Sequence, residues 1–154
     1  MQTNKFLCKY QNDFTLTLLT INVRGCNSEL ERKKQFTWMR DLEADIVFMQ
    51  ETHTEKNIEN TWRVQWGYTI VFSHGSSNSK GVAILFKRAL PVKIQHYECD
   101  TNGRWIFLTI LVNGVKLNLM NIYAPNDKEE QKEFFTEIKN LLGMYHSTNI
   151  PLII

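Results

Sequence analysis

The spacing of apolar and polar residues changes several times along the first fifty positions, and each spacing predicts an element. Residues 14–23 alternate apolar side chains with threonines before becoming wholly apolar, which predicts a strand that enters a core. Ser28 and Glu31 form a capping box, and apolar residues at helical spacing follow it up to about Glu43. The short apolar run 46–49 predicts a fully buried strand, so this region should form a strand–helix–strand unit.

Consecutive strands replace this alternation in the rest of the chain. Residues 51–66 are expected to be a polar connection, and residues 74–80 a loop. Five apolar runs predict strands, at residues 67–73, 81–87, 91–98, 104–112 and 115–123. Asn113 and Gly114 separate the last two runs and indicate a hairpin, because both residues accept a positive φ. The sheet is therefore expected to be at least partly antiparallel.

A second amphipathic helix is predicted after residue 126. Asp127 and Glu130 can cap its start, and Gly143 is expected to end it. Residues 150–154 then predict another buried strand, although a charged carboxylate is unfavourable at the end of a core strand. We therefore expect an α+β domain over residues 14–154 that is incomplete at its C-terminus, preceded by an N-terminal extension over residues 1–13.

Composition narrows the class of protein. The 154 residues have 18 Lys and Arg against 16 Asp and Glu, and this net charge of +2 alone does not indicate a polyanionic partner. The three cysteines, Cys8, Cys26 and Cys99, lack a CxxC spacing and are interpreted as reduced thiols. The N-terminus lacks the apolar run of a secretory signal, and no window approaches the ~20 apolar residues of a membrane span. We expect an intracellular protein without a membrane segment.

Candidate chemistry lies where the predicted buried strands end. Asn22 follows "LLTI", Glu51 follows "IVFMQ", and the polar segment 121–126 follows "LNLM". Such positions tend to gather at one rim of a sheet, where ligands bind. A carboxylate, amides and a tyrosine at one rim suit a hard metal ion and a phosphate. Each residue alone has an ordinary structural role, such as a turn former or a solvated strand end, so the hypothesis rests on their combination.

Four motifs also carry a resemblance to a known family. In order, they are "LLTINVRG", "DIVFMQETHT", "GVAILF" and "NIYAPN". Together they resemble the first half of the endonuclease/exonuclease/phosphatase superfamily, over about residues 14–154. More narrowly, they resemble the apurinic/apyrimidinic-type endonuclease domain that begins the polyprotein of non-LTR (LINE-type) retrotransposons. The resemblance implies a four-layer α/β-sandwich of the deoxyribonuclease I-like type, of which this chain holds roughly the first half to two-thirds.

The resemblance also implies a role for each matching residue. Glu51 would ligate a catalytic Mg²⁺, with Mn²⁺ as the alternative, and Asn22 would lie beside the metal and the scissile phosphate. Tyr123 would stabilise the pentacovalent phosphate, and Asn126 would contact a DNA phosphate. His53 stands where repair enzymes of the family carry a lysine that steadies the glutamate, and an imidazole can donate a similar hydrogen bond.

Two departures from the family pattern affect this interpretation. Arg24 stands where repair-type members carry an acidic residue, which weakens the case for a second metal, although an arginine can bind a phosphate. The "GDFN"-like motif around the attacking water and the later "SDH"-like motif would both follow Ile154. The resemblance thus implies Mg²⁺-dependent hydrolysis of double-stranded DNA, in the nucleus or cytoplasm. It also implies that this polypeptide alone is inactive, because it lacks the general base.

Three alternatives stay open at this point. A histidine-metal site could use four histidines that lie on separate segments without a short ligand spacing, His53, His74, His96 and His146. A non-catalytic remnant could bind nucleic acid through basic residues, which are scattered along the chain. A phosphatase of the same superfamily would act on inositol phosphates or lipids.

Overall fold

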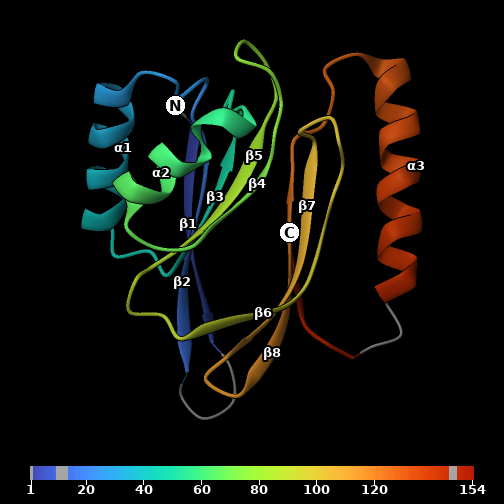
Figure 1. Ribbon diagram of the computed structural model, residues 1–154. Coiled ribbons are helices and arrows are strands. Elements are labelled where there is room, and N and C mark those ends of the chain that lie inside the picture. Colours follow the sequence, from blue (N-terminus) through green and yellow to red (C-terminus); the bar gives the residue numbers. More distant parts are fainter. Residues whose placement is uncertain (1, 10–13, 146–148) are drawn as a thin grey trace.

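The protein is organised in four layers, with two β-sheets face to face between layers of helices (Figure 1). The computed structural model describes residues 2–9, 14–145 and 149–154. Helices α1 (Glu29–Asp41) and α2 (Glu59–Trp66) cover the outer face of the first sheet, and α3 (Lys128–Tyr145) covers the outer face of the second. None of the helices in these described ranges is both long and apolar enough to cross a membrane. The predicted α+β class and layer order are confirmed.

The first sheet has five strands in the order β1-β2-β3-β5-β4. Their bounds are β1 Gln2–Lys9, β2 Thr15–Asn22, β3 Ile46–Gln50, β4 Ile70–Ser73 and β5 Val82–Phe86. β2 and β3 are parallel and joined by α1, so the predicted strand–helix–strand unit is confirmed. Because they run in the same direction, Asn22 and Gln50 are register partners at one end of the sheet. This pairing brings two of the polar strand ends together.

The second sheet is a meander followed by a short parallel strand. Its order is β6-β7-β8-β9, with bounds β6 Val92–Cys99, β7 Trp105–Val112, β8 Val115–Ile122 and β9 Leu152–Ile153. Asn113 and Gly114 have φ of 47° and 79° between β7 and β8, as the hairpin signal predicts. The expectation of a partly antiparallel sheet is confirmed.

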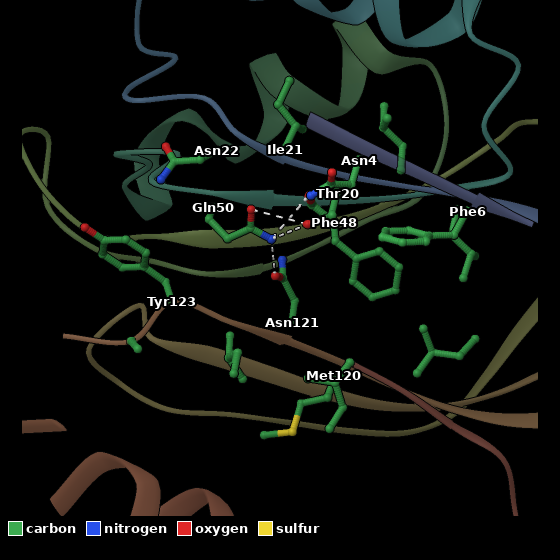
Figure 2. Close-up of a pocket in the computed structure, with 16 residues that line it drawn as sticks. Asn4, Phe6, Thr20, Ile21, Asn22, Phe48, Gln50, Met120, Asn121 and Tyr123 are labelled. Atoms are coloured by element: carbon green, nitrogen blue, oxygen red, sulfur yellow. Dashed lines mark hydrogen bonds between the residues drawn. The ribbon is translucent and has the colours of Figure 1, made fainter. Parts of the chain in front are cut away.

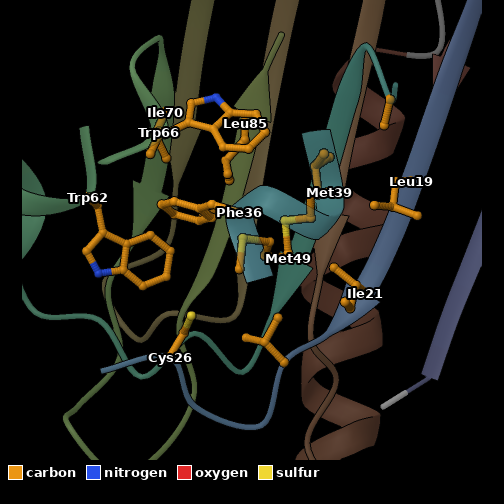
Figure 3. Packing of buried hydrophobic residues seen from close by; sticks show 14 of the residues in the cluster. Leu19, Ile21, Cys26, Phe36, Met39, Met49, Trp62, Trp66, Ile70 and Leu85 are labelled. Carbon is orange, nitrogen blue, oxygen red and sulfur yellow. The ribbon is translucent and has the colours of Figure 1, made fainter. Parts of the chain in front are cut away.

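Three apolar layers separate these four layers of secondary structure. In β2, Leu16 and Leu18 face the second sheet, whereas Leu19 and Ile21 face α1 and α2. Phe36 and Trp62 from these helices pack in the same outer layer, which Figure 3 shows. A third layer joins the second sheet to α3. A central strand that is buried on both faces has apolar side chains at consecutive positions, which explains the uninterrupted apolar runs in the sequence.

Three elements lie where none was predicted, and the shortest of them is the 3-10 helix η2 (Lys56–Ile58). Residues 2–9 form β1, which pairs antiparallel with the whole of β2. Residues 59–66, expected to be a polar connection, form α2, and its Trp62 and Trp66 are buried. Because most helical stability comes from tertiary packing, two tryptophans four residues apart can stabilise a short helix with a weak pattern.

Two other expectations about the end of the chain are wrong. Gly143 does not end α3, which continues to Tyr145, and the ring of Tyr145 stacks on Phe107 at 4.0 Å between centroids. This stacking offsets the cost of a glycine within a helix. Residues 150–154 do not form a buried strand, since β9 has two residues and Ile154 is 63% exposed. Among the residues that the structure describes, β9 pairs with β8 in parallel, at the end of the second sheet.

Candidate active site at the rim of the sheets

The polar residues that follow β2, β3 and β8 meet at one rim of the two sheets. A cavity of about 460 Å³ lies there, and Figure 2 shows Asn22 and Tyr123 on one side of it with Gln50 and Asn121 next to them. Asn22 and Gln50 come from the first sheet, whereas Asn121 and Tyr123 come from the second. Glu51 directly follows Gln50 and bonds to Asn22. The prediction that these strand ends lie together is therefore correct.

Asn22 and Glu51 form the polar centre of this rim. Asn22 Nδ2 donates a hydrogen bond of 2.6 Å to Glu51 Oε1, and Asn22 Oδ1 accepts one of 3.1 Å from the Arg24 backbone N–H. If the amide were reversed, its oxygen would face the Glu51 carboxylate and its NH₂ group would face the Arg24 N–H. These two hydrogen bonds therefore fix the orientation of the Asn22 side chain. Asn22 therefore supports the carboxylate with its nitrogen and leaves Glu51 Oε2 as the candidate metal ligand.

The two loops at the rim, after β2 and after β3, have strained backbones. Arg24, Glu51 and His53 have φ of 52°, 53° and 55°, which lie in the left-handed region. For residues other than glycine, each such conformation costs about 1–3 kcal/mol and persists only when its surroundings impose it. Strain of this kind concentrates at active sites and ligand clamps. Its occurrence at three candidate site residues supports a functional role for the rim.

His53 lies against the neighbouring loop. A Cβ added to Gly25 would lie 2.9 Å from His53 Nδ1, and Gly25 itself has a φ of +91°. Only glycine fits this position without displacing the imidazole or straining the backbone. The Gly25 N–H also donates a 2.7 Å hydrogen bond to the Glu51 carbonyl. The half-buried imidazole thus packs on the backbone that holds Glu51.

Tyr123, which follows β8, is held by Arg104, which precedes the neighbouring strand β7 of the same sheet. Its backbone N–H donates to the Arg104 carbonyl at 2.7 Å, and the Arg104 guanidinium lies over its ring at 5.4 Å. Burial raises the pKa of the Tyr123 phenol, and the negative charge of Glu51 raises it further. The phenol therefore keeps its proton at neutral pH and remains a hydrogen-bond donor beside Glu51.

Gln50 and Asn121 join the two sheets directly beneath these residues. Asn121 is 2% exposed, and its Nδ2 donates to the carbonyls of Met49 and Ala83 at 2.9 Å each. Its Oδ1 accepts a 2.7 Å hydrogen bond from Gln50 Nε2. The sequence placed Asn121 in the candidate segment 121–126, but it did not predict a bridge to Gln50, although amides at the ends of apolar runs must find partners when buried. The bridge fixes Glu51 and Tyr123 relative to each other through their near neighbours.

Other predicted site residues are more peripheral. Arg24 is exposed and joins the rim through its backbone. Asn126 is exposed in the segment between β8 and α3 and does not line the cavity. His74 bonds to Glu59, and His96 bonds to Tyr145 on the second sheet. His146, the fourth residue of the histidine-metal alternative, lies outside the described residues.

The donor set at the rim fits one kind of metal. Across the described ranges, no three His, Cys, Asp or Glu side chains are grouped closely enough to hold an ion by themselves. Mg²⁺ differs from zinc in this respect, because it commonly keeps several waters and binds one or two carboxylates together with substrate phosphate. Glu51, with its Oε2 oriented by the bond from Asn22, meets that requirement. Mn²⁺ accepts the same oxygen ligands.

Comparisons with known proteins identify the family. The model of the Endonuclease/Exonuclease/phosphatase family matches residues 19–154. The chain is also 29% identical over 138 residues to the Transposon TX1 uncharacterized 149 kDa protein of Xenopus laevis. That match covers 90% of this chain and 11% of the transposon protein. The resemblance carried by the four sequence motifs is therefore confirmed.

Solved structures share the fold. An AP endonuclease from Archaeoglobus fulgidus has a TM-score of 0.57 and 24% identity, covering 86% of this chain and 52% of that one. The endonuclease domain of TRAS1, a telomere-specific non-LTR retrotransposon, has a TM-score of 0.56 and 17% identity, covering 80% of this chain and 52% of that one. This chain spans about half the length of both structures. The expected deoxyribonuclease I-like architecture is confirmed, and the chain belongs to the Endonuclease/Exonuclease/phosphatase family.

Proposed function

We propose that this chain forms the N-terminal part of a Mg²⁺-dependent endonuclease that hydrolyses phosphodiester bonds in double-stranded DNA. The arrangement of Asn22, Glu51 and Tyr123 at one rim carries the proposal. It places an oriented carboxylate beside a protonated phenol, which is what binding of a metal ion and a phosphate requires. A DNA substrate also implies action in the nucleus or cytoplasm.

The residues at the centre of the rim have separate parts in this chemistry. The metal, when bound, neutralises negative charge on the scissile phosphate. Glu51 would hold it through Oε2, while Asn22 fixes the carboxylate by its hydrogen bond to Oε1. Tyr123 would donate its phenolic proton in a hydrogen bond to a non-bridging phosphate oxygen, where charge accumulates in the transition state.

The residues around this centre would bind the rest of the DNA backbone. Arg24 is exposed beside Asn22 and can form charge-assisted hydrogen bonds to phosphate. Asn126, exposed three residues after Tyr123, would contact a phosphate farther along the strand. His53 would act indirectly, since its ring packs against Gly25 in the loop that bonds to Glu51.

The transposon relative favours a nuclease over a phosphatase, because the similar solved structures include both nucleases and a mannosyl-6-phosphatase. The AP endonuclease and the TRAS1 endonuclease domain are both nucleases, and the Xenopus laevis relative is a transposon protein. A phosphatase acting on inositol phosphates or lipids remains an outcome of the test, because the family includes both activities.

A purely nucleic-acid-binding remnant has less support from the charge distribution. Arg24 lies beyond the end of β2, at the rim. Lys87 lies at the opposite end of the first sheet, where its N–H donates to the Asp45 carbonyl just before β3 begins. Arg63 bonds to Glu59 and to the Ile70 carbonyl. These cations do not form one continuous surface, as backbone binding alone would need.

Nicking of supercoiled DNA tests the proposed function. The 154-residue chain is compared with an extended polypeptide, which is produced by continuing translation of the reading frame past Ile154. The extended polypeptide should nick DNA with Mg²⁺ and lose activity with EDTA. The 154-residue chain should be at least about 10²-fold slower, because neither "GDFN" nor "SDH" occurs in it to supply the general base.

Each alternative has its own outcome in this assay. Hydrolysis of an inositol phosphate or phospholipid without nicking would identify a phosphatase. DNA binding by the extended polypeptide without cleavage would identify a binding remnant. If the 154-residue chain nicks DNA as fast as the extended polypeptide, the proposal that it is inactive alone is wrong.

A further inference from the structure

A chain of four side chains connects α2 to the interior of the loop that carries Glu51. His74 Nε2 lies 2.7 Å from Glu59 Oε1, and His74 Nδ1 lies 3.3 Å from Thr54 Oγ1. Thr54 Oγ1 lies 3.0 Å from Thr52 Oγ1, and both threonines are 0% exposed. We call Glu59, His74, Thr54 and Thr52 the threonine relay. It ends one residue after Glu51.

One set of hydrogen-bond directions, with a neutral His74, satisfies every group in the relay. Although burial raises the pKa of Glu59, hydrogen bonds from His74 and Arg63 hold this pKa below its ordinary value. The ionised carboxylate can only accept, so His74 Nε2 donates to it, and in neutral His74 the Nδ1 atom accepts from the Thr54 hydroxyl. Thr54 then accepts from Thr52. Every donor in the relay thus has one acceptor.

The position of His74 is fixed from two further sides. Its ring stacks on Phe72 with centroids 5.3 Å apart and an angle of 16° between planes. Arg63 holds the other oxygen of Glu59 at 3.2 Å, within the same helix. The imidazole is therefore a rigid support for the Thr54 hydroxyl, rather than a mobile surface group.

The far end of the relay fits tightly against its surroundings. A Cβ added to Gly81 would lie 2.5 Å from Thr52 Oγ1, so the hydroxyl lies directly on the Gly81 backbone. The Thr52 N–H donates to the Gly81 carbonyl, and the Thr52 carbonyl accepts from the Cys26 N–H at 3.2 Å. Thr52 stands between Glu51 and His53, the two left-handed residues of the loop. A group that fixes Thr52 also fixes the backbone that aims Glu51.

We propose that His74 is a positioning residue, which holds the Glu51 loop in its left-handed conformation through Thr54 and Thr52. His74 itself does not touch the metal or the substrate. The functional consequence rests on the proposed role of Glu51 as metal ligand. The structural consequence, an ordered loop at residues 51–53, does not depend on that role.

Amide hydrogen exchange of the ¹⁵N-labelled 154-residue chain tests the relay. His74→Phe keeps a ring on Phe72 but removes both nitrogens, and Thr54→Val removes only the hydroxyl. Each should lower protection of the Gly25 and Cys26 amides, which donate to the Glu51 and Thr52 carbonyls, by about tenfold or more. Thr54→Ser, which restores a hydroxyl, should recover most of this protection.

Two controls separate positioning from general destabilisation. Protection of amides within β7 and β8 should stay unchanged in these variants. His96→Phe, which alters a histidine bonded to Tyr145 on the second sheet, should leave the Gly25 and Cys26 amides unaffected. Unchanged loop protection in both His74→Phe and Thr54→Val, or an equal fall throughout the molecule, would overturn the inference.

A metal titration then links the relay to function. Mn²⁺ is the probe, and the measured quantity is the Mn²⁺ concentration that broadens the backbone amide signal of Glu51. His74→Phe should raise this concentration several-fold, whereas His96→Phe should leave it unchanged. If His74→Phe and the wild type need the same Mn²⁺ concentration for this broadening, the functional part of the inference is contradicted. If wild-type Glu51 does not respond to Mn²⁺ at all, the proposed function fails, while the exchange experiment still decides whether the relay orders the loop.

Discussion

Replacing Glu51 with glutamine is expected to slow Mg²⁺-dependent nicking by the extended polypeptide at least about 10²-fold. Changes to residues that merely orient a ligand typically cost about 10- to 100-fold in metal affinity or activity, and loss of the ligand's charge should cost more. The substitution keeps the shape of the side chain and its contact with Asn22. Nicking rates over a series of Mg²⁺ concentrations should show that much of the loss comes from weaker metal binding.

The matched control is Glu55→Gln, which removes the same charge from an exposed residue four positions later. This variant should nick within about twofold of the wild type, because solvent and salt screen an exposed carboxylate that is not itself a ligand. Equal effects of the two substitutions would show that Glu51 contributes only general negative charge. The role of Glu51 as metal ligand would then have to be abandoned.

Replacing Asn121 with leucine is expected to lower the free energy of unfolding by about 1.5–4.5 kcal/mol. Leucine has a similar size but cannot form the three side-chain hydrogen bonds of Asn121, to the Met49 and Ala83 carbonyls and from Gln50, and each such bond contributes about 0.5–1.5 kcal/mol. Unfolding of the 154-residue chain in urea, followed by tryptophan fluorescence, measures this change. The loss should be accompanied by weaker Mn²⁺ binding, because the bridge to Gln50 is broken at the same time.

Asn118→Leu provides the comparison within the same strand. Asn118 is also 2% exposed, but its side-chain oxygen accepts one hydrogen bond, from the Thr109 hydroxyl. This substitution should cost about 1–3 kcal/mol, since it leaves one hydroxyl unpaired. A larger loss for Asn118→Leu than for Asn121→Leu would show that the bridge between the sheets is not an important source of stability.

The sequence was sufficient to predict the parts of the site that depend on strand ends. Asn22 and Glu51 end parallel neighbours, so their meeting follows from the strand–helix–strand pattern alone. The hairpin at Asn113 and Gly114 likewise follows from local turn preferences. These features depend on interactions between residues close in the chain or on simple alternation, which a single sequence displays directly.

Features that depend on distant partners were not predictable in the same way. The bridge between Gln50 and Asn121 joins residues 71 positions apart, and the local sequence around either residue does not indicate which distant residue it will bond to. α2 is stabilised by Trp62 and Trp66 packing against Phe36 of another helix, so its own eight residues carry a weak signal. The contact between His74 and Thr54 likewise depends on how β4 and the Glu51 loop pack.

Paramagnetic mapping of metal binding tests the central claim, that the rim at Asn22, Glu51 and Tyr123 binds a divalent cation. The ¹⁵N-labelled 154-residue chain is titrated with Mn²⁺, an ion with the same oxygen ligands as Mg²⁺. We expect the amide signals of Asn22, Glu51 and Tyr123 to broaden first, and Glu51→Gln to abolish this broadening. Broadening confined to exposed carboxylates such as Glu29 and Glu31, with the rim signals unchanged, would contradict the account.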